Sequence, residues 1–271
     1  MQRTAIFFSP HPDDIEIGTP FLYLSLLKSG YRVIEILMTD GAFGTVDLNF
    51  KGRRLAKIRE RELENSNKIF EKATNNHVEL VRLNYLDGYL PFNNKLLNQI
   101  SDIIQHYNPS IIFAPDFWYS QDFHSDHINT GRLIFFSIKK LSSNQPIPIQ
   151  LFYYYSSAKN RYINIQKDMI FTIIAGLSEH RSQLSPFMVK IIKIFYLIFV
   201  LGINFIRFRR WKVGYRTQFY DRHNFPIYPS KFGKETLRNR IKYYLYYNPT
   251  LKAYKKLHKV TPSEIDLNIQ K

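Results

Sequence analysis

Short apolar segments alternate with longer amphipathic segments along residues 1–185 of this chain. Each short segment is four to seven residues long and mostly apolar, which is typical of short strands, and Thr4–Phe8 has the pattern of a buried one. Strands that alternate with helices usually pair in parallel, and the helices cover both faces of the sheet. The sequence therefore predicts a doubly wound, mostly parallel α/β sheet. The expected strands are Thr4–Phe8, Arg32–Met38, Val78–Leu83, Ile111–Ala114 and Gln150–Tyr155, and the expected helices are Ile15–Ser29, Leu55–Ala73, Leu96–His106, Ile128–Lys140 and Lys167–Glu179.

A histidine and two adjacent carboxylates directly follow the first expected strand: His11, Asp13 and Asp14. One interpretation is a polar turn in which an Asp caps the next helix, where the peptide dipoles favour negative charge. However, two neighbouring carboxylates repel each other unless a cation or separate roles keep them apart. One Asp could therefore bind a metal ion while its neighbour, pointing another way, acts as a base.

A second cluster of the same residue types, His124, Asp126 and His127, follows the fourth expected strand. His127 could bind a metal while Asp126 orients His124 through a hydrogen bond. In an open parallel sheet the carboxyl ends of the strands lie on one rim, which is where ligands bind. We therefore expect the two clusters to meet around one divalent ion, with about three protein ligands and a position left for water.

The chain contains no cysteine, which excludes disulfides, Cys-ligated zinc and iron–sulfur clusters. Any metal must be held by His and Asp or Glu, and this favours Zn²⁺ or another divalent ion that accepts imidazole and oxygen ligands. The apolar run at the N-terminus is too short for a signal peptide, so we expect a cytoplasmic protein.

The two polar clusters, with four further motifs, resemble the motifs of a known family. Six motifs fall in the same order as in the PIG-L/LmbE family, whose members are zinc-dependent de-N-acetylases of N-acetylglucosamine-type sugars with a Rossmann-like α/β fold. The resemblance covers about residues 3–185. The motifs are His11-Pro12-Asp13-Asp14, Thr39-Asp40-Gly41, Arg59-x-x-Glu62, Asp87-Gly88, His124-x-Asp126-His127 and His180-x-Ser182-Gln183.

The resemblance implies metal ligands, a general base, a side chain that stabilises the transition state, and residues that hold the sugar. Ser125 stands where the family commonly has a proline, which leaves the ligand set intact. The implied metal ligands are His11, Asp14 and His127; the implied catalytic residues are Asp13 and His124; the implied sugar-binding residues are Arg59 and Asp87. The catalytic role of Asp126, orienting His124, rests on the residue cluster and not on the resemblance.

Two of these motifs also have simpler interpretations. Arg59 and Glu62 lie three residues apart on an expected helix, and without the resemblance this spacing favours a surface ion pair worth under about 1 kcal/mol. His180 lies at the end of an expected helix, where a histidine cation is favoured by the helix dipole.

The implied reaction is hydrolysis of the acetamide of an N-acetylated amino sugar to acetate and a free amino sugar. The carrier of the sugar, nucleotide or lipid, is left open. Two alternatives remain: an amidase that acts on a different amide conjugate, and a catalytically silent membrane- or glycan-binding module with the same fold.

Residues 186–271 form a basic, aromatic-rich C-terminal extension to the predicted catalytic domain, residues 1–185. The extension has 18 Lys and Arg against 4 Asp and Glu, and so carries most of the formal charge of +16. Within residues 188–212, the uninterrupted apolar run Ile194–Ile203 is too short to span a membrane. The basic and aromatic cluster Arg207–Lys212 follows.

We expect residues 188–212 to form a helix that lies on the cytoplasmic leaflet and contacts anionic lipid or a lipid-linked sugar. The alternatives are a helix buried against the sheet, an oligomer contact, or a membrane span. Nucleic-acid binding is not predicted, because no recognition motif appears.

Overall fold

A computed structural model of the chain describes residues 2–45, 50–117, 119–122, 124–144, 148–203, 205–206 and 210–220. Its strands are β1 (Thr4–Ser9), β2 (Arg32–Thr39), β3 (Val78–Tyr85), β4 (Ile111–Pro115), β5 (Ile149–Tyr154), β6 (Arg161–Asn164) and β7 (Lys212–Tyr220). Its helices are α1 (Asp14–Gly18), α2 (Pro20–Lys28), α3 (Arg53–Thr74), α4 (Asn94–Tyr107), α5 (Ser125–Asn144), α6 (Met169–Leu177) and α7 (Pro186–Phe195), which continues as a π-helix, η1 (Tyr196–Ile203).

The sheet has the strand order β3-β2-β1-β4-β5-β7-β6. Strands β1 to β5 are all parallel, and β7 is antiparallel to both β5 and β6. The chain moves outward from β1 through β2 to β3 and then returns to place β4 on the other side of β1. The strand order therefore reverses between β1 and β4, which is the point where doubly wound sheets bind their ligands. The predicted mostly parallel α/β fold is confirmed.

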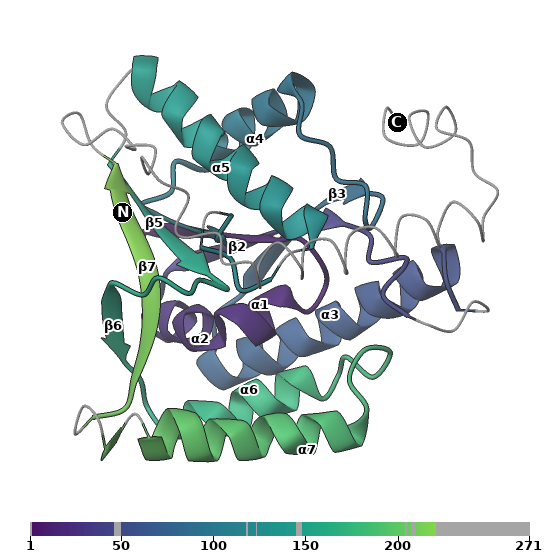
Figure 1. Cartoon of the computed structure of the whole chain (residues 1–271), viewed down its shortest axis with the longest axis vertical. Helices are drawn as coiled ribbons and strands as arrows, with labels where there is room; N and C mark the ends of the chain where they lie inside the picture. Colours follow the sequence, from purple (N-terminus) through teal and green to yellow (C-terminus); the bar gives the residue numbers. More distant parts are fainter. Residues whose placement is uncertain are drawn as a thin grey trace, which may run out of the picture.

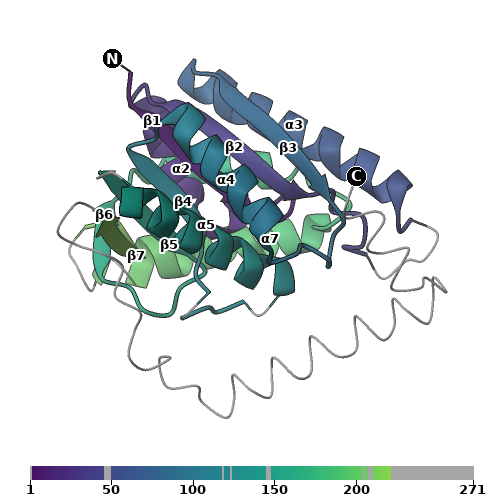
Figure 2. The same cartoon turned by 90° about the horizontal axis from the view of Figure 1, so that it is seen from above.

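Helices cover both faces of the sheet (Figures 1 and 2). Helices α2, α3 and α6 pack on one face, and α4 and α5 pack on the other. Buried side chains alternate along β1 because successive residues point to opposite faces. Ala5 and Phe7 belong to the core on the α2 side, whereas Ile6 and Phe8 belong to the core on the α5 side.

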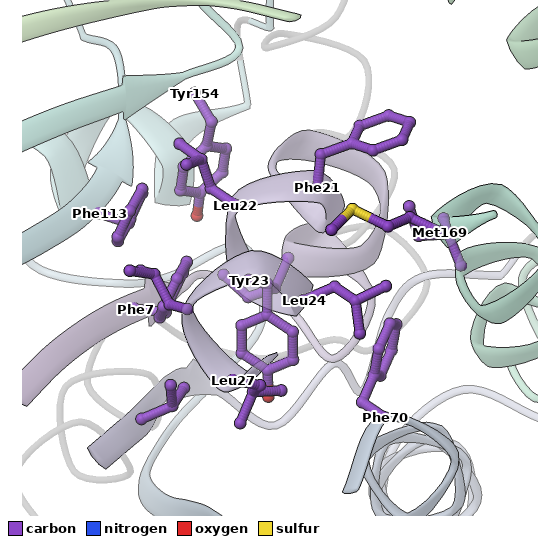
Figure 3. Close-up of a cluster of buried hydrophobic side chains, with 14 of the residues drawn as sticks. Phe7, Phe21, Leu22, Tyr23, Leu24, Leu27, Phe70, Phe113, Tyr154 and Met169 are labelled. Atoms are coloured by element: carbon purple, nitrogen blue, oxygen red, sulfur yellow. The ribbon is translucent and has the colours of Figure 1, made fainter. Parts of the chain in front are cut away.

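Helix α2 lies at the centre of the hydrophobic core on its own side of the sheet (Figure 3). The ring of Tyr23 meets Phe7 of β1 edge-on at 4.9 Å between centroids and Phe70 of α3 at 5.5 Å. Phe21 and Met169 extend this contact toward α6 (Figure 3). Each buried side chain of this size contributes roughly 1.5–3 kcal/mol through removal from water. This cluster therefore holds helices α2, α3 and α6 against the sheet.

The prediction of one continuous helix over residues 15–29 is wrong. Helix α1 ends at Gly18, helix α2 begins at Pro20, and Thr19 between them has φ −146° and ψ 34°. Proline lacks the N–H of a helix interior, and it disfavours a helical conformation of the preceding residue. The break separates short α1, which begins at Asp14, from the buried helix α2.

The C-terminal extension contributes to the sheet as well as to the helix layer. Strand β7, which was not predicted, pairs with β5 through Ile149 to Tyr153 and with β6 through all four residues of that strand. No helix in the described ranges is long and apolar enough to cross a bilayer. The basic residues of 207–209, and all of residues 221–271, lie outside the described residues.

A buried ion pair ties β7 to the loop after β4. Arg216 is 5% exposed and donates to both carboxylate oxygens of Asp116, which is 0% exposed, at 2.5 and 3.0 Å. The same carboxylate accepts hydrogen bonds from Ser156 Oγ at 2.6 Å and from the Tyr119 N–H at 3.1 Å. The guanidinium lies 3.8 Å from the ring centroid of Tyr153. Bidentate pairing of this kind fixes geometry as well as charge, so β7 holds the loop that leads to His124.

A second buried carboxylate, Glu35, lies on β2 beneath helix α2. It is 1% exposed, and its Oε2 accepts hydrogen bonds from Tyr23 at 3.2 Å and Asn67 at 3.0 Å. Burial, followed by the negative charge of Glu16, raises the pKa of Glu35 to about 8. The folded protein therefore retains a proton on Glu35 that the unfolded chain releases above its ordinary pKa.

We predict that Glu35→Gln will change the pH dependence of stability. Between about pH 5 and about pH 8, the wild type should lose stability relative to the variant, because ionisation of Glu35 is favoured only in the unfolded state. Urea unfolding of both proteins across this range tests the prediction. Glu64→Gln, a partly exposed site on α3, is the matched control. A difference in unfolding free energy that stays constant across the range would contradict it.

Candidate metal centre and active site

Three predicted metal ligands converge at the rim between β1 and β4. The Nδ1 atom of His11, the Oδ2 atom of Asp14 and the Nε2 atom of His127 each lie 3.1 Å from the other two. His11 follows β1, Asp14 begins α1, and His127 lies in the first turn of α5. All three residues are at least nine-tenths buried. The structure thus brings together side chains that are separated by more than one hundred residues in sequence.

The donor atoms suit a single divalent ion. Ligands bonded at about 2.0–2.1 Å to a tetrahedral ion lie roughly 3.3–3.4 Å apart, close to the observed spacing. Although burial opposes a positive charge here, the carboxylates of Asp14 and Asp122 raise the pKa of His127 to about 9. The surroundings therefore favour additional positive charge, which a divalent cation supplies.

Each imidazole of this centre has a carboxylate at its other ring nitrogen. His11 Nε2 lies 3.2 Å from Asp87 Oδ1 and 3.3 Å from Asp126 Oδ2, and His127 Nδ1 lies 3.2 Å from Asp122 Oδ2. The hydrogen bond between Nε2 of His11 and Asp126 orients that ring, and the charge of Asp122 favours a proton on Nδ1 of His127, so that in each ring the opposite nitrogen is available to a metal. The arrangement therefore presents Nδ1 of His11 and Nε2 of His127 as ligand atoms.

Asp14 is oriented by Tyr155, which directly follows β5. The Tyr155 hydroxyl donates to Asp14 Oδ1 at 3.0 Å, and its ring stacks on His127 at 5.3 Å between centroids. Burial, followed by the charge of Asp14, raises the pKa of Tyr155 well above its usual value. The phenol therefore remains a donor to Oδ1 and leaves Oδ2 directed at the two imidazoles.

Asp13 lies beside this group but points to Arg59. Its Oδ1 accepts a hydrogen bond from Arg59 Nη2 at 2.8 Å. Within the described part of the chain its Oδ2 has no hydrogen-bond partner, and its side chain is 13% exposed. The carboxylate is thus anchored through one oxygen and has the other available. It does not cap α1 through its side chain, as the simpler interpretation required.

The simpler interpretation of Arg59 and Glu62 as a surface ion pair is also wrong. Arg59 is 3% exposed and Glu62 is 8% exposed. Glu62 accepts hydrogen bonds from the backbone N–H and the hydroxyl of Ser182 at 2.8 and 2.6 Å. Two of the sequence motifs therefore contact each other, and they tie helix α3 to the loop after α6.

Gly41 allows Arg59 to approach the site. It has φ +64°, and a Cβ atom at this position would lie 3.0 Å from the guanidinium and 2.9 Å from Pro12. Its carbonyl accepts a hydrogen bond from Arg59 Nη1 at 3.2 Å. The preceding Asp40 accepts a hydrogen bond from the N–H of Asp87 at 3.2 Å. The Thr39-Asp40-Gly41 motif therefore positions side chains around the metal centre.

His124 lies at the edge of the cluster and is only partly buried. Its ring centroid is 4.6 Å from that of His11 and 5.5 Å from that of His127. A ring nitrogen of His124 belongs to a group of possible metal-binding atoms with His11 and His127 that lie within 4.8 Å of one another. Burial, followed by the charge of His11, lowers the pKa of His124. Its position suits contact with a bound substrate.

The predicted hydrogen bond from His124 to the Asp126 carboxylate is not what the structure shows. The carboxylate accepts from the N–H groups of Gly88 at 2.7 Å and Leu90 at 3.1 Å and contacts His11. These donors belong to the loop after β3, and they turn a fully buried carboxylate away from His124. His124 Nδ1 instead lies 3.3 Å from the backbone N–H of Asp126.

Asp87 and Arg59 are placed inside the site rather than at its surface. Burial alone would raise the pKa of Asp87, but the charges of His11 and Arg59 hold it well below its usual range. The carboxylate of Asp87 contacts His11, and the guanidinium of Arg59 contacts Asp13. Binding of the sugar by these two residues remains a prediction.

His180 lies away from the metal group. It is fully buried, and its Nε2 lies 3.0 Å from Oε1 of Glu16, which also accepts a hydrogen bond from Ser66. Glu16 is on α1, two residues after Asp14. His180 therefore lies just past the C-terminal end of α6, as expected, and holds the helix that presents Asp14.

Sequence reasoning missed Tyr155, Asp122 and Glu16. The position of Tyr155, at the carboxyl end of a third parallel strand, could have revealed it. Asp122 precedes the second histidine cluster by two residues, and Glu16 follows the first by two. Their contacts depend on side-chain direction, which spacing alone does not specify.

Comparison with known proteins identifies similar sequences and folds. Residues 6–136 match the family model described as PIG-L: GlcNAc-PI de-N-acetylase. A diacetylchitobiose deacetylase from Thermococcus kodakarensis is 27% identical over 193 residues, which are 67% of this chain and 70% of that protein.

Solved structures share the fold. The N,N'-diacetylchitobiose deacetylase from Pyrococcus horikoshii matches with a TM-score of 0.70 and 26% identity, over 84% of this chain and 88% of that one. The 4-carboxy-2-hydroxymuconate hydratase GalB from Pseudomonas putida matches with a TM-score of 0.62 over 85% of this chain and 99% of that one, but at 12% identity it shows the fold alone. The resemblance inferred from the motifs is confirmed: residues 6–136, just under half of the chain, match the PIG-L family model.

Proposed function

We propose that this protein is a metal-dependent de-N-acetylase that hydrolyses the acetamide of an N-acetylglucosamine-type sugar to acetate and a free amino sugar. The observation that supports this most directly is the convergence of His11, Asp14 and His127 within 3.1 Å, beside the available carboxylate oxygen of Asp13. The similarity to diacetylchitobiose deacetylases supports the substrate class.

In this proposal the ion is Zn²⁺, held by His11, Asp14 and His127. Two imidazole nitrogens and one carboxylate oxygen form a ligand set that zinc hydrolases commonly use, with a further position for water or substrate. When bound, such an ion lowers the pKa of water from 15.7 to about 7 and polarises a carbonyl oxygen.

The protein side chains provide the proton transfers. Asp13, anchored by Arg59, accepts the proton of the attacking water as the new C–O bond forms. His124 donates a hydrogen bond to the oxygen that becomes negative, an interaction worth about 3–4 kcal/mol in comparable sites. The C–N bond then breaks, and the amine leaves with a proton from either Asp13 or His124.

The partner and location are also part of the proposal. The substrate is an N-acetylated amino sugar, which could be a nucleotide- or lipid-linked glycan precursor. The protein is located in the cytoplasm, peripherally on the cytoplasmic face of a membrane, and the support for this is the exposed apolar surface of α7.

The central prediction is that the protein releases acetate from N-acetylated amino sugars only when metal is bound. A screen of free, nucleotide-linked and lipid-linked N-acetyl sugars, with and without chelator and with Zn²⁺ added back, measures this directly. Release from other amide conjugates alone would favour the alternative amidase. Metal binding without turnover of any compound would favour the silent binding module.

Asp13→Asn should lower kcat by about 10²–10⁴, because the amide cannot accept a proton. Bound metal should be unchanged, since Asp13 is not one of the three ligands in this assignment. Steady-state kinetics and elemental analysis measure the two effects. Asp102→Asn, an exposed site on α4, is the matched control. Wild-type turnover in Asp13→Asn would refute the assignment of the base.

His127→Ala should lose the metal, because it removes one of three ligand atoms. Zinc content after exhaustive dialysis, measured per folded chain, tests this expectation. His106→Ala replaces an exposed histidine of α4 and should retain the wild-type content. Full metal occupancy in His127→Ala would show that the ligand is a different residue.

A further inference from the structure

Helix α7 and η1 have apolar side chains on two opposite sides. Val189 and Ile192 pack against the core, and Tyr196 is 8% exposed. The other side carries apolar residues at spacings of three and four that remain exposed. These residues are Phe187 (70%), Met188 (46%), Ile191 (49%), Ile194 (46%), Phe195 (49%) and Ile198 (51%). A helix that only covers the sheet needs one apolar side, so the second side has a separate purpose.

Neighbouring elements extend this exposed surface. Phe171 of α6 is 66% exposed, and Lys193 Nζ lies 5.9 Å from its ring centroid, so α6 and α7 share the surface. Beyond η1, Ile206 is 72% exposed, and Phe205 stacks on Trp211 at 5.5 Å between centroids. Helix α7 is the outermost layer on this side of the molecule, at the lower edge of Figure 1.

The Lys, Arg, Asp and Glu positions of this region are all basic. Residues 186–220 contain seven Lys and Arg and no Asp or Glu. Lys190 and Lys193 are exposed on α7 between its two apolar sides, and Arg210 is exposed next to Trp211. Exposed apolar side chains, flanking basic groups and an aromatic residue with a polar N–H are together typical of helices that lie in a membrane interface.

We infer that α7, η1 and the Phe205–Trp211 pair form a docking face for the surface of an anionic phospholipid bilayer. The apolar side chains of α7 enter the boundary between headgroups and acyl chains, with the helix axis parallel to the membrane. Lys190, Lys193 and Arg210 remain at the level of the phosphates.

Charge argues against two other occupants of this face. A symmetric contact with a second copy would place the same basic surface on both sides, where like charges repel each other. Residues 221–271 contain 11 Lys and Arg against 4 Asp and Glu, so they also have the wrong sign to cover it. An anionic lipid surface complements both the apolar and the charged parts.

Docking by this face does not depend on the proposed chemistry, because α7 contributes no side chain to the metal centre. It does bear on access to the site. Ser185 caps α7, and Ser182, three residues earlier, is bound to Glu62, which lies one turn after Arg59 on α3. The docking face therefore begins close to the active rim.

Vesicle flotation of the full-length protein tests the inference. Vesicles of phosphatidylcholine mixed with phosphatidylglycerol should carry the wild type upward, whereas pure phosphatidylcholine should not. The double variant Ile191→Glu/Ile198→Glu should reduce the bound fraction roughly tenfold or more. Lys190→Glu/Lys193→Glu should reduce it by a similar factor, and added salt should weaken wild-type binding.

Phe92→Glu, which changes an equally exposed aromatic residue far from α7 in sequence, is the matched control and should float as the wild type does. Circular dichroism and acetate release from a water-soluble substrate should be unchanged in all three variants, since the altered side chains lie outside the site. Wild-type protein that stays with the soluble fraction would overturn the inference. So would undiminished flotation of Ile191→Glu/Ile198→Glu, or a dimer in solution that this variant dissociates.

Discussion

The parallel pairing of β1 with β4 is the constraint on which the rest of the site depends. It aligns Ala5 with Ile111 and Phe7 with Phe113, whose rings stack at 4.0 Å between centroids. Because both strands run in the same direction, the segments that follow them leave the sheet at the same rim. A shift of one residue in this register would turn the buried side chains of β1 to the opposite face. The position of the two histidine clusters relative to each other is therefore set by the packing of the core.

The polar part of the site is built mainly from carboxylates that surround two imidazoles. The ring nitrogen of His11 that faces away from the other ligand atoms contacts Asp87 and Asp126. The corresponding nitrogen of His127 contacts Asp122. Burying so many acidic groups is costly unless positive charge accompanies them. Backbone N–H groups and Arg59 provide part of that compensation, and a bound cation would provide the rest. The same residues that orient the ligands thus create the local field that attracts the ion.

The sequence predicted the five parallel strands and both polar clusters, because the strands are short, mostly apolar segments and the clusters lie in the segments that follow two of them. It did not predict β7, which pairs antiparallel with β5. Lys212 and Arg216 interrupt the apolar pattern of this strand. Orientation was harder to predict than position. Asp126 was expected beside His124, but the loop after β3 supplies two N–H donors that turn its carboxylate toward His11. Such choices are made by tertiary contacts that residue spacing does not encode.

The ion pair between Arg216 and Asp116 also has a consequence for how much of the chain is needed to hold the site. Asp116 lies in the part of the chain that carries the family motifs, whereas the guanidinium that pairs with both of its oxygens comes from the last strand. A protein shortened at residue 185 would retain every predicted ligand and yet leave a buried carboxylate without this counter-charge. The smallest autonomous unit of this enzyme is therefore expected to extend through β7, well past the last residue that family resemblance would mark.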